Sequence, residues 1–159
     1  TGFLYVRREL FEELWPTIVG YRSDEHPFEF NFRELQLARS ARRYEGGQLN
    51  FPGFAGMNES IALLQSFGLV NVWDRIASLL DRLTHGLKQN VNLQIRSALE
   101  TAFRSGIVNL GCRDPKLVGE RLLKRGIAIS VRDGGLRVSP HFYNTEQEID
   151  RLLSELSEL

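Results

Sequence analysis

The C-terminal part of the sequence predicts an α+β fold, a small antiparallel sheet with helices on one of its faces. Three observations support this prediction. Short apolar segments bounded by turn residues recur after residue 90, two capped helical segments alternate with them, and Asp133-Gly134-Gly135 predicts a tight turn between two of the segments. The resulting order, strand–strand–helix–strand–strand–helix, is typical of a layered α+β structure.

The elements of this region can be assigned one by one. Strands are expected at 93–95, where apolar and polar residues alternate, and at 107–110, 127–131 and 136–139. Asp114-Pro115 predicts a helix start, and Gly126 its end after Lys124-Arg125. Thr145 and Glu148 have the spacing of a capping box. The helix that follows places one apolar face along Ile149, Leu152, Leu153, Leu156 and Leu159.

The N-terminal part predicts less regular structure. In chain order we expect a strand at 2–6 buried on both faces, a short helix at 7–14 ending before Pro16, a long ordered loop at 19–31, an apolar helix at 54–67 closed by Gly68, and an amphipathic helix from Val72 to about Leu87. A connection of four residues, 68–71, separates the last two. We therefore predict two domains, residues 1–70 and 71–159.

Composition excludes several classes of function. Lysine plus arginine and aspartate plus glutamate both number 20, so the zero net charge gives no reason to expect nucleic acid or an anionic membrane as partner. No apolar run approaches the ~20 residues of a membrane-spanning helix, and a cytoplasmic location is expected. The single Cys112 excludes an internal disulfide. His26, His85 and His141 lack metal-site spacing. The chain opens on an apolar run without Met, and we expect it to be part of something larger.

Two segments carry candidate binding residues. Arg137 lies between apolar neighbours, and its guanidinium either extends to water or binds a planar anion such as a carboxylate. Gly46-Gly47-Gln48 either forms a plain turn or brings a left-handed backbone close to a ligand, with successive N–H groups facing an anion. Of the preceding arginines, Arg39, Arg42 and Arg43, the simplest account is a solvated helical face, and the alternative is a dimer interface.

At these residues the chain resembles the C-terminal portion of the class V aminotransferases. This branch of the fold-type I pyridoxal-phosphate enzymes includes cysteine desulfurases, isopenicillin-N-epimerase-like proteins and kynureninases. The resemblance lies in TGFLYVRREL, ARRYEGGQLNFPGFAGM, DPKLVGERLLKRGIAISVR and LRVSPHFYNTEQEIDRLL, which occur in the family's order and cover essentially the whole chain. It implies that the N-terminal portion is the last strand and interface segment of an α/β large domain.

The resemblance also implies roles for individual residues. Arg137 matches the arginine that binds the carboxylate of the amino-acid substrate, for which bidentate guanidinium geometry is suited. Gly47 and Gln48 match the turn that reaches the phosphate of pyridoxal 5′-phosphate (PLP) in a neighbouring subunit. The family usually has threonine where this chain has Gln48. A homodimer through residues 36–52 is therefore implied, as is transamination, epimerisation or lyase chemistry.

Two departures from the family pattern limit this interpretation. The family's Schiff-base lysine is expected upstream of Thr1, and no lysine precedes Lys88, so we expect no catalytic residue in the chain and no activity from it alone. Desulfurases carry a nucleophilic cysteine on the loop before the motif arginine, where this chain has only Asp133-Gly134-Gly135-Leu136. Desulfurase activity is thus disfavoured, and Cys112 is expected to be a small packed residue.

Three further residues are open to a site role. His141 would share a strand face with Arg137 if the strand continued, although a structural or solvent role is favoured. His85 is expected to be solvated. Tyr21 and Arg22 in the long loop are equally open to a pocket role and a structural one. The alternative for the whole chain is a non-catalytic α+β module that binds a partner protein.

Overall fold

The computed structural model describes residues 1–29, 33–88 and 90–158. The chain divides into two compact units, Thr1–Ala62 and Leu63–Leu159, and each is described by itself. The helix α1, Phe51–Phe67, contains the residue at which the division falls. The predicted domains, with their division at residue 70, stay a prediction about the large and small domains of the family. None of the helices in the described ranges is both long and apolar enough to cross a membrane.

The second unit contains the predicted antiparallel sheet. Its four strands, β1 (Gln94–Ile95), β2 (Val108–Gly111), β3 (Ser130–Arg132) and β4 (Gly135–Val138), lie in the order β1-β2-β4-β3. The strand expected at 127–131 begins three residues later than predicted. Since Ser130 pairs with Arg137, residues 127–129 continue opposite 138–140, where Pro140 has no N–H to donate. The α+β class is confirmed.

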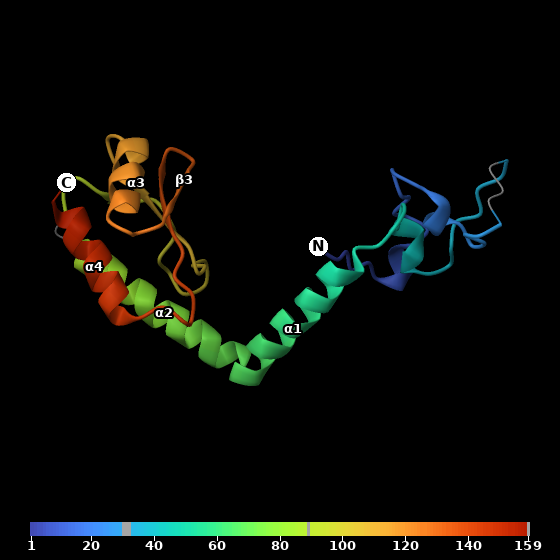
Figure 1. The fold of residues 1–159 in the computed structure, drawn as a ribbon, viewed down its shortest axis with the longest axis horizontal. Coiled ribbons are helices and arrows are strands. Elements are labelled where there is room, and N and C mark those ends of the chain that lie inside the picture. Colours follow the sequence, from blue (N-terminus) through green and yellow to red (C-terminus); the bar gives the residue numbers. More distant parts are fainter. Residues whose placement is uncertain (30–32, 89, 159) are drawn as a thin grey trace. The chain divides into compact units, whose positions relative to one another are not determined.

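Three helices cover one face of this sheet: α2 (Leu69–Gly86), α3 (Pro115–Lys124) and α4 (Glu146–Ser157). Alternation in β2 and β4 directs Val108, Leu110, Leu136 and Val138 into one apolar core, with exposed fractions of 0 to 4%. The helices contribute leucines and β-branched residues to the same core, and α2 and α4 lie side by side (Figure 1). The opposite face carries polar side chains.

A two-residue turn connects β3 to β4. Asp133 and Gly134 both have positive φ, 50° and 65°, as a type I′ turn requires, and Gly135 is already the first residue of β4. Arg96 donates hydrogen bonds to the carbonyl oxygens of Asp133 and Gly134, at 3.2 Å each. The turn that the sequence predicts is thus confirmed, and Arg96 holds it beside β1.

The connection between α1 and α2 is shorter than predicted. Only Gly68 separates the helices, with φ of 81°, and α2 begins at Leu69 rather than at Val72. The Gly68 carbonyl accepts from the Val72 N–H at 3.0 Å, and the Asn71 amide donates to the Phe67 carbonyl at 2.9 Å. Because one left-handed glycine changes the chain direction, the four-residue linker is unnecessary.

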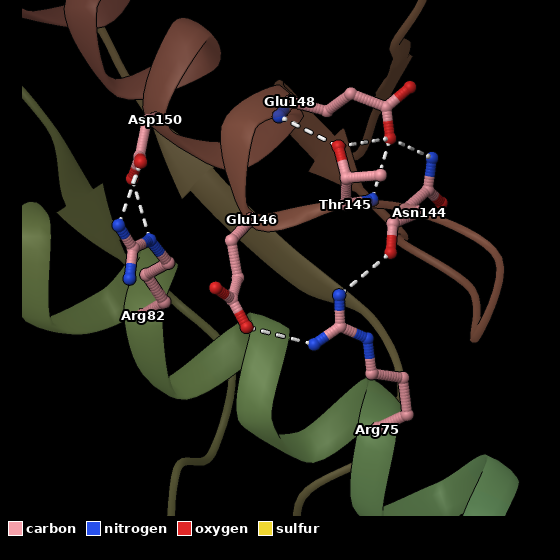
Figure 2. Close-up of polar contacts among 7 residues, drawn as sticks. All are labelled: Arg75, Arg82, Asn144, Thr145, Glu146, Glu148 and Asp150. Atoms are coloured by element: carbon pink, nitrogen blue, oxygen red, sulfur yellow. Dashed lines mark hydrogen bonds and ion pairs between the residues drawn. The ribbon is translucent and has the colours of Figure 1, made fainter.

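The predicted capping box starts α4 (Figure 2). The Thr145 hydroxyl accepts from the Glu148 N–H at 3.2 Å, and the Glu148 carboxylate accepts from the Thr145 N–H at 2.7 Å. Ion pairs join the exposed sides of α2 and α4: Arg75 contacts Glu146 at 3.0 Å, and Arg82 forms a bidentate pair with Asp150. Leu159, predicted on the apolar face of this helix, lies outside the described residues.

The strand predicted at 2–6 is absent from the first unit as described. Phe3 and Tyr5 are each 78% exposed, so the burial on both faces is also wrong. The physical reason is that a strand needs a hydrogen-bonded partner, and the described part of this unit contains no sheet. The helix expected at 7–14 is a 3-10 turn, Arg8–Leu10, followed by turn residues.

The first unit is held together by arginines and short turns. Arg43 is 6% exposed and donates to the Phe11 carbonyl at 2.9 Å, while Arg42 donates to the carbonyls of Asp24 and Glu25. A solvated face was the simplest expectation for Arg39, Arg42 and Arg43. It is wrong for Arg42 and Arg43, because each donates to backbone carbonyls of partly buried residues, whereas Arg39 is exposed. The loop expected at 19–31 includes the 3-10 helix Tyr21–Ser23, and its residues 30 and 31 lie outside the described ranges.

Gly68→Ala should lower the free energy of unfolding by about 1 to 2 kcal/mol, because alanine at a φ of 81° meets steric repulsion that glycine avoids. The control is Gly56→Ala in α1, where an added Cβ meets nothing within 4 Å. That change should stabilise by roughly 0.5 to 1 kcal/mol. Urea unfolding followed by circular dichroism measures both, and equal effects of the two changes would contradict the prediction.

Candidate functional site

The register of β4 places Arg137 on the sheet face opposite the core. Leu136 and Val138, its neighbours in the strand, are 0% and 4% exposed, so the side chain between them must point away from the helices. Arg137 is partly buried there. Its Nη2 donates weakly to the Ser130 hydroxyl on β3, at 3.4 Å. Its Nε is buried and has no hydrogen-bond partner in the part of the chain described.

Arg137 is one of the residues that line a pocket of about 280 Å³. The pocket lies where β4 ends, between the segment leading into β3 and the first turns of α4. The apolar part of its wall comes from the core edge, and the polar part from Ser130, Arg137, Ser139, Asn144 and Glu148. Among the described residues, Arg137 forms no ion pair with a carboxylate. The site therefore offers an unpaired cation to an anionic group of small size.

Hydrogen bonds at the start of α4 fix Asn144 and Glu148, which line the pocket. The Glu148 carboxylate accepts from the Thr145 N–H and from the Asn144 amide, at 2.7 and 3.2 Å. These hydrogen bonds, chiefly the one from the Thr145 backbone, lower the pKa of Glu148. The carboxylate is consequently held at the helix start, where it is an oriented acceptor.

The second candidate segment, Gly46-Gly47-Gln48, packs on the 3-10 helix Tyr21–Ser23 of the first unit. Gly20 touches the Gly46 carbonyl so closely that a Cβ at Gly20 would lie 1.8 Å from its oxygen. The Ser23 hydroxyl donates to the Glu45 carbonyl at 2.9 Å, and Arg22 pairs with the Glu45 carboxylate at 3.0 Å. Arg22 thus has a structural contact.

Of the two alternatives for the paired glycines, a plain turn or a left-handed backbone, the left-handed backbone does not occur. In the described ranges positive φ occurs at Gly68, Gly126, Gly134 and Asp133, but not at Gly46 or Gly47. The two glycines instead provide open space, since an added Cβ would meet nothing within 4 Å at either one. Gln48 is exposed, and its Oε1 accepts from the Tyr21 hydroxyl at 3.4 Å.

The remaining candidates lie away from the pocket. Cys112 follows β2 at the turn end of the sheet, and burial raises the pKa of its thiol, which disfavours the thiolate. His141 is not in the pocket wall: β4 ends at Val138, so the alternation stops, and the imidazole stacks on Tyr143. His85 is exposed and His26 lies 3.7 Å from Glu29. No group of three or more metal-binding side chains occurs within the described ranges.

Ser130, Asn144 and Glu148 were not anticipated as pocket residues. The sequence assigned Glu148 and Thr145 to helix capping, which the structure confirms, without showing that Glu148 lines the same pocket as Arg137. Predicting Ser130 as a neighbour of Arg137 requires the strand register, because the Ser130–Arg137 pairing brings the hydroxyl beside the guanidinium. A correct β-hairpin register could have been deduced from the Asp-Gly turn by counting outward.

Comparison with known proteins gives a consistent family assignment. The model of the family described as Aminotransferase class-V matches residues 1–152. The uncharacterized aminotransferase YcbU of Bacillus subtilis is 24% identical over 157 residues, which are 98% of this chain and 40% of that protein. A cysteine desulfurase of Serratia proteamaculans is 31% identical over 181 residues, covering 99% of this chain and 41% of the relative. The chain therefore spans about two fifths of the length of these relatives.

Solved structures show the same fold. The apo cysteine desulfurase of Thermococcus onnurineus has a TM-score of 0.84 and 21% identity, with 97% of this chain and 41% of that chain covered. A variant of C-DES with glycine covalently linked to its PLP cofactor has a TM-score of 0.80 and 23% identity, with 98% and 41% covered. The fold of this chain therefore also occurs in these two solved structures.

Replacing Glu148 by Gln should remove part of the acid sensitivity of the fold. Since the pKa of this carboxyl is lowered in the folded state from its ordinary 4.5, its contribution is present above that value and is lost as pH falls through the folded pKa. We expect Glu148→Gln to be less stable than the parent at about pH 7 and to converge with it at about pH 3. Urea unfolding at a series of pH values measures this, and parallel curves would contradict it.

Proposed function

Because the chain belongs to the class V aminotransferase family, we propose that it forms part of a PLP-dependent enzyme acting on an amino acid, in which Arg137 binds the substrate carboxylate. The observation that carries the proposal is the Arg137 site itself. Arg137 is partly buried, its Nε is buried without a hydrogen-bond partner among the described residues, and the residue lines a pocket of about 280 Å³. A cation held there without a carboxylate partner is arranged for an anion supplied from outside.

The walls of the pocket suit an amino-acid substrate. The guanidinium offers parallel N–H donors to a carboxylate, and Ser130 limits its rotation from the neighbouring strand. Apolar residues, among them Ile127, Ile129 and Leu152, also line the pocket and would exclude water from one side of an ion pair formed there. Removing water strengthens a charge-assisted hydrogen bond, since the local dielectric constant is lower.

Pyridoxal phosphate is the cofactor that the family implies. When bound, it would supply the electron sink for reactions at the substrate's α-carbon. We propose that Gly47 and Gln48 bind its phosphate, through the Gly47 N–H and the side-chain amide of Gln48, since the space beside Gly47 is open and Gln48 is exposed. A homodimer through residues 36–52 would present this turn to the cofactor of the partner subunit, as the resemblance implies.

We propose that the reaction is one of four types: transamination, epimerisation, lyase chemistry or desulfuration. The short turn before Arg137 disfavours a desulfurase, but the Serratia and Thermococcus proteins similar to this chain are named cysteine desulfurases, which weighs against that expectation. The position and raised pKa of Cys112 argue only that this cysteine is not a sulfur-accepting nucleophile. Desulfurase chemistry would therefore need another group.

Arg137→Ala, made in the full-length protein loaded with PLP, should weaken the binding of an amino-acid substrate by about 2 to 5 kcal/mol, since a charge-assisted pair is lost. Arg137→Lys should recover only part of the affinity, because an ammonium cannot form the bidentate pair. Titration of the cofactor absorbance with L-alanine and L-cysteine measures both. Arg113→Ala, at an exposed position, is the matched control. An affinity unchanged in Arg137→Ala would remove Arg137 from the site.

Cys112→Ser, made in the full-length protein loaded with PLP, should leave the turnover rate within about twofold of its original value. The thiol lies at the turn end of the sheet, with a pKa raised by burial, so a hydroxyl of similar size substitutes for it without loss of a nucleophile. Steady-state rates on L-cysteine, with sulfide and alanine both quantified, check this. Loss of sulfide release in Cys112→Ser, with folding intact, would show that the thiol takes part.

A further inference from the structure

Asn109 is the cross-strand neighbour of Arg137. The two residues pair directly in the register between β2 and β4. The Asn109 N–H donates to the Ser97 hydroxyl at 2.8 Å, and its carbonyl accepts from the Arg96 N–H at 2.9 Å, so both backbone groups bond on the β1 side. Asn109 and Arg137 consequently form a non-hydrogen-bonded pair, in which facing side chains are closest. Both lie on the face away from the core.

The amide of Asn109 has a fixed orientation. Its Nδ2 donates to the Arg132 carbonyl on β3 at 3.0 Å, and only the amide nitrogen can donate there. The side chain reaches that strand by crossing β4 at Gly135, where an added Cβ would lie 2.1 Å from Oδ1. A glycine is thus required at 135 for the crossing. Oδ1 then faces the polar side of the sheet.

One acceptor and one donor are left unpaired on these two neighbours. Asn109 Oδ1 and Arg137 Nε are both buried, and neither has a hydrogen-bond partner within the described ranges. Leaving a buried polar group unpaired is costly, and the cost is highest for a charged one. The two atoms are chemically complementary, and they belong to residues that pair directly across β2 and β4, on the same face of the sheet.

We propose that Asn109 is a positioning residue for Arg137. Its Oδ1 accepts a hydrogen bond from Arg137 Nε when the guanidinium binds the substrate carboxylate, so that both Nη atoms are turned to the substrate. Ser130 fixes the guanidinium from β3 and Asn109 from β2. This inference rests on the proposed function, since it assigns Asn109 a role only through carboxylate binding at Arg137.

The test compares three variants of the full-length, PLP-loaded protein. Asn109→Ala should raise the apparent dissociation constant for L-alanine and L-cysteine roughly tenfold, the usual effect of one hydrogen bond to a charged group, and leave the maximal rate within about twofold. Arg96→Met is the control, because Arg96 also binds the β3–β4 turn but contacts the carbonyls of Asp133 and Gly134 instead of Arg137. Arg137→Ala reports on the proposed function separately.

A second measurement uses the unaltered protein and does not depend on the folding of a variant. With arginine labelled at Nε, solvent exchange of the Arg137 Hε should slow by at least tenfold when L-alanine saturates the site, since this proton enters a hydrogen bond. Exchange unchanged by L-alanine would overturn the proposal. In Asn109→Ala the slowing should be absent.

The outcomes separate the two ideas. A tenfold loss of affinity in Asn109→Ala with no loss in Arg96→Met supports positioning. Equal losses in the two variants would show that loosening of the turn is responsible, and would overturn it. An unaffected Asn109→Ala beside a weakened Arg137→Ala overturns the inference and leaves the proposed function standing. An unaffected Arg137→Ala overturns the proposed function itself.

Discussion

The burial of Leu136 and Val138 in β4 is the constraint from which the candidate site follows. These side chains complete the core that α2, α3 and α4 form on one face of the sheet. Because the side chains of successive residues in a strand point to opposite faces of the sheet, the Arg137 side chain lies on the face opposite the core. The same alternation in β2 places Asn109 opposite it. Hydrophobic packing on one side of the sheet therefore positions the polar groups on the other side.

The pocket beside Arg137 depends on how three elements end. β4 ends at Val138, before Pro140. β3 begins at Ser130, and α4 begins at Glu146, directly after the N-cap Thr145. Each end has a local cause. Pro140 lacks an N–H after β4, the register of the turn sets the start of β3, and the Thr145 side chain accepts from an N–H of the first turn of α4. Together they leave space at a corner of the unit where polar side chains converge.

The two units use different means of stabilisation. The second has a continuous apolar core beneath its sheet. The first relies on Arg42 and Arg43, whose guanidinium groups satisfy backbone carbonyls of neighbouring turns, and on the close contact between Gly20 and Gly46. Its large apolar residues are often exposed, as at Phe3, Tyr5 and Ile18. The turn 46–48 is accordingly positioned by hydrogen bonds more than by apolar packing.

Local signals in the sequence were sufficient to predict several elements of the second unit. These are the Asp-Gly turn, the capping box, the Asp114-Pro115 helix start and the strand that carries Arg137. Each depends on residues close in the chain, so its physics needs no distant partner. Tertiary structure alone decided that Gly2–Val6 is no strand, that Arg43 is buried, and that Asn109 pairs with Arg137. These outcomes depend on which segments pair and in what register, and a single residue's neighbours in sequence do not specify that pairing.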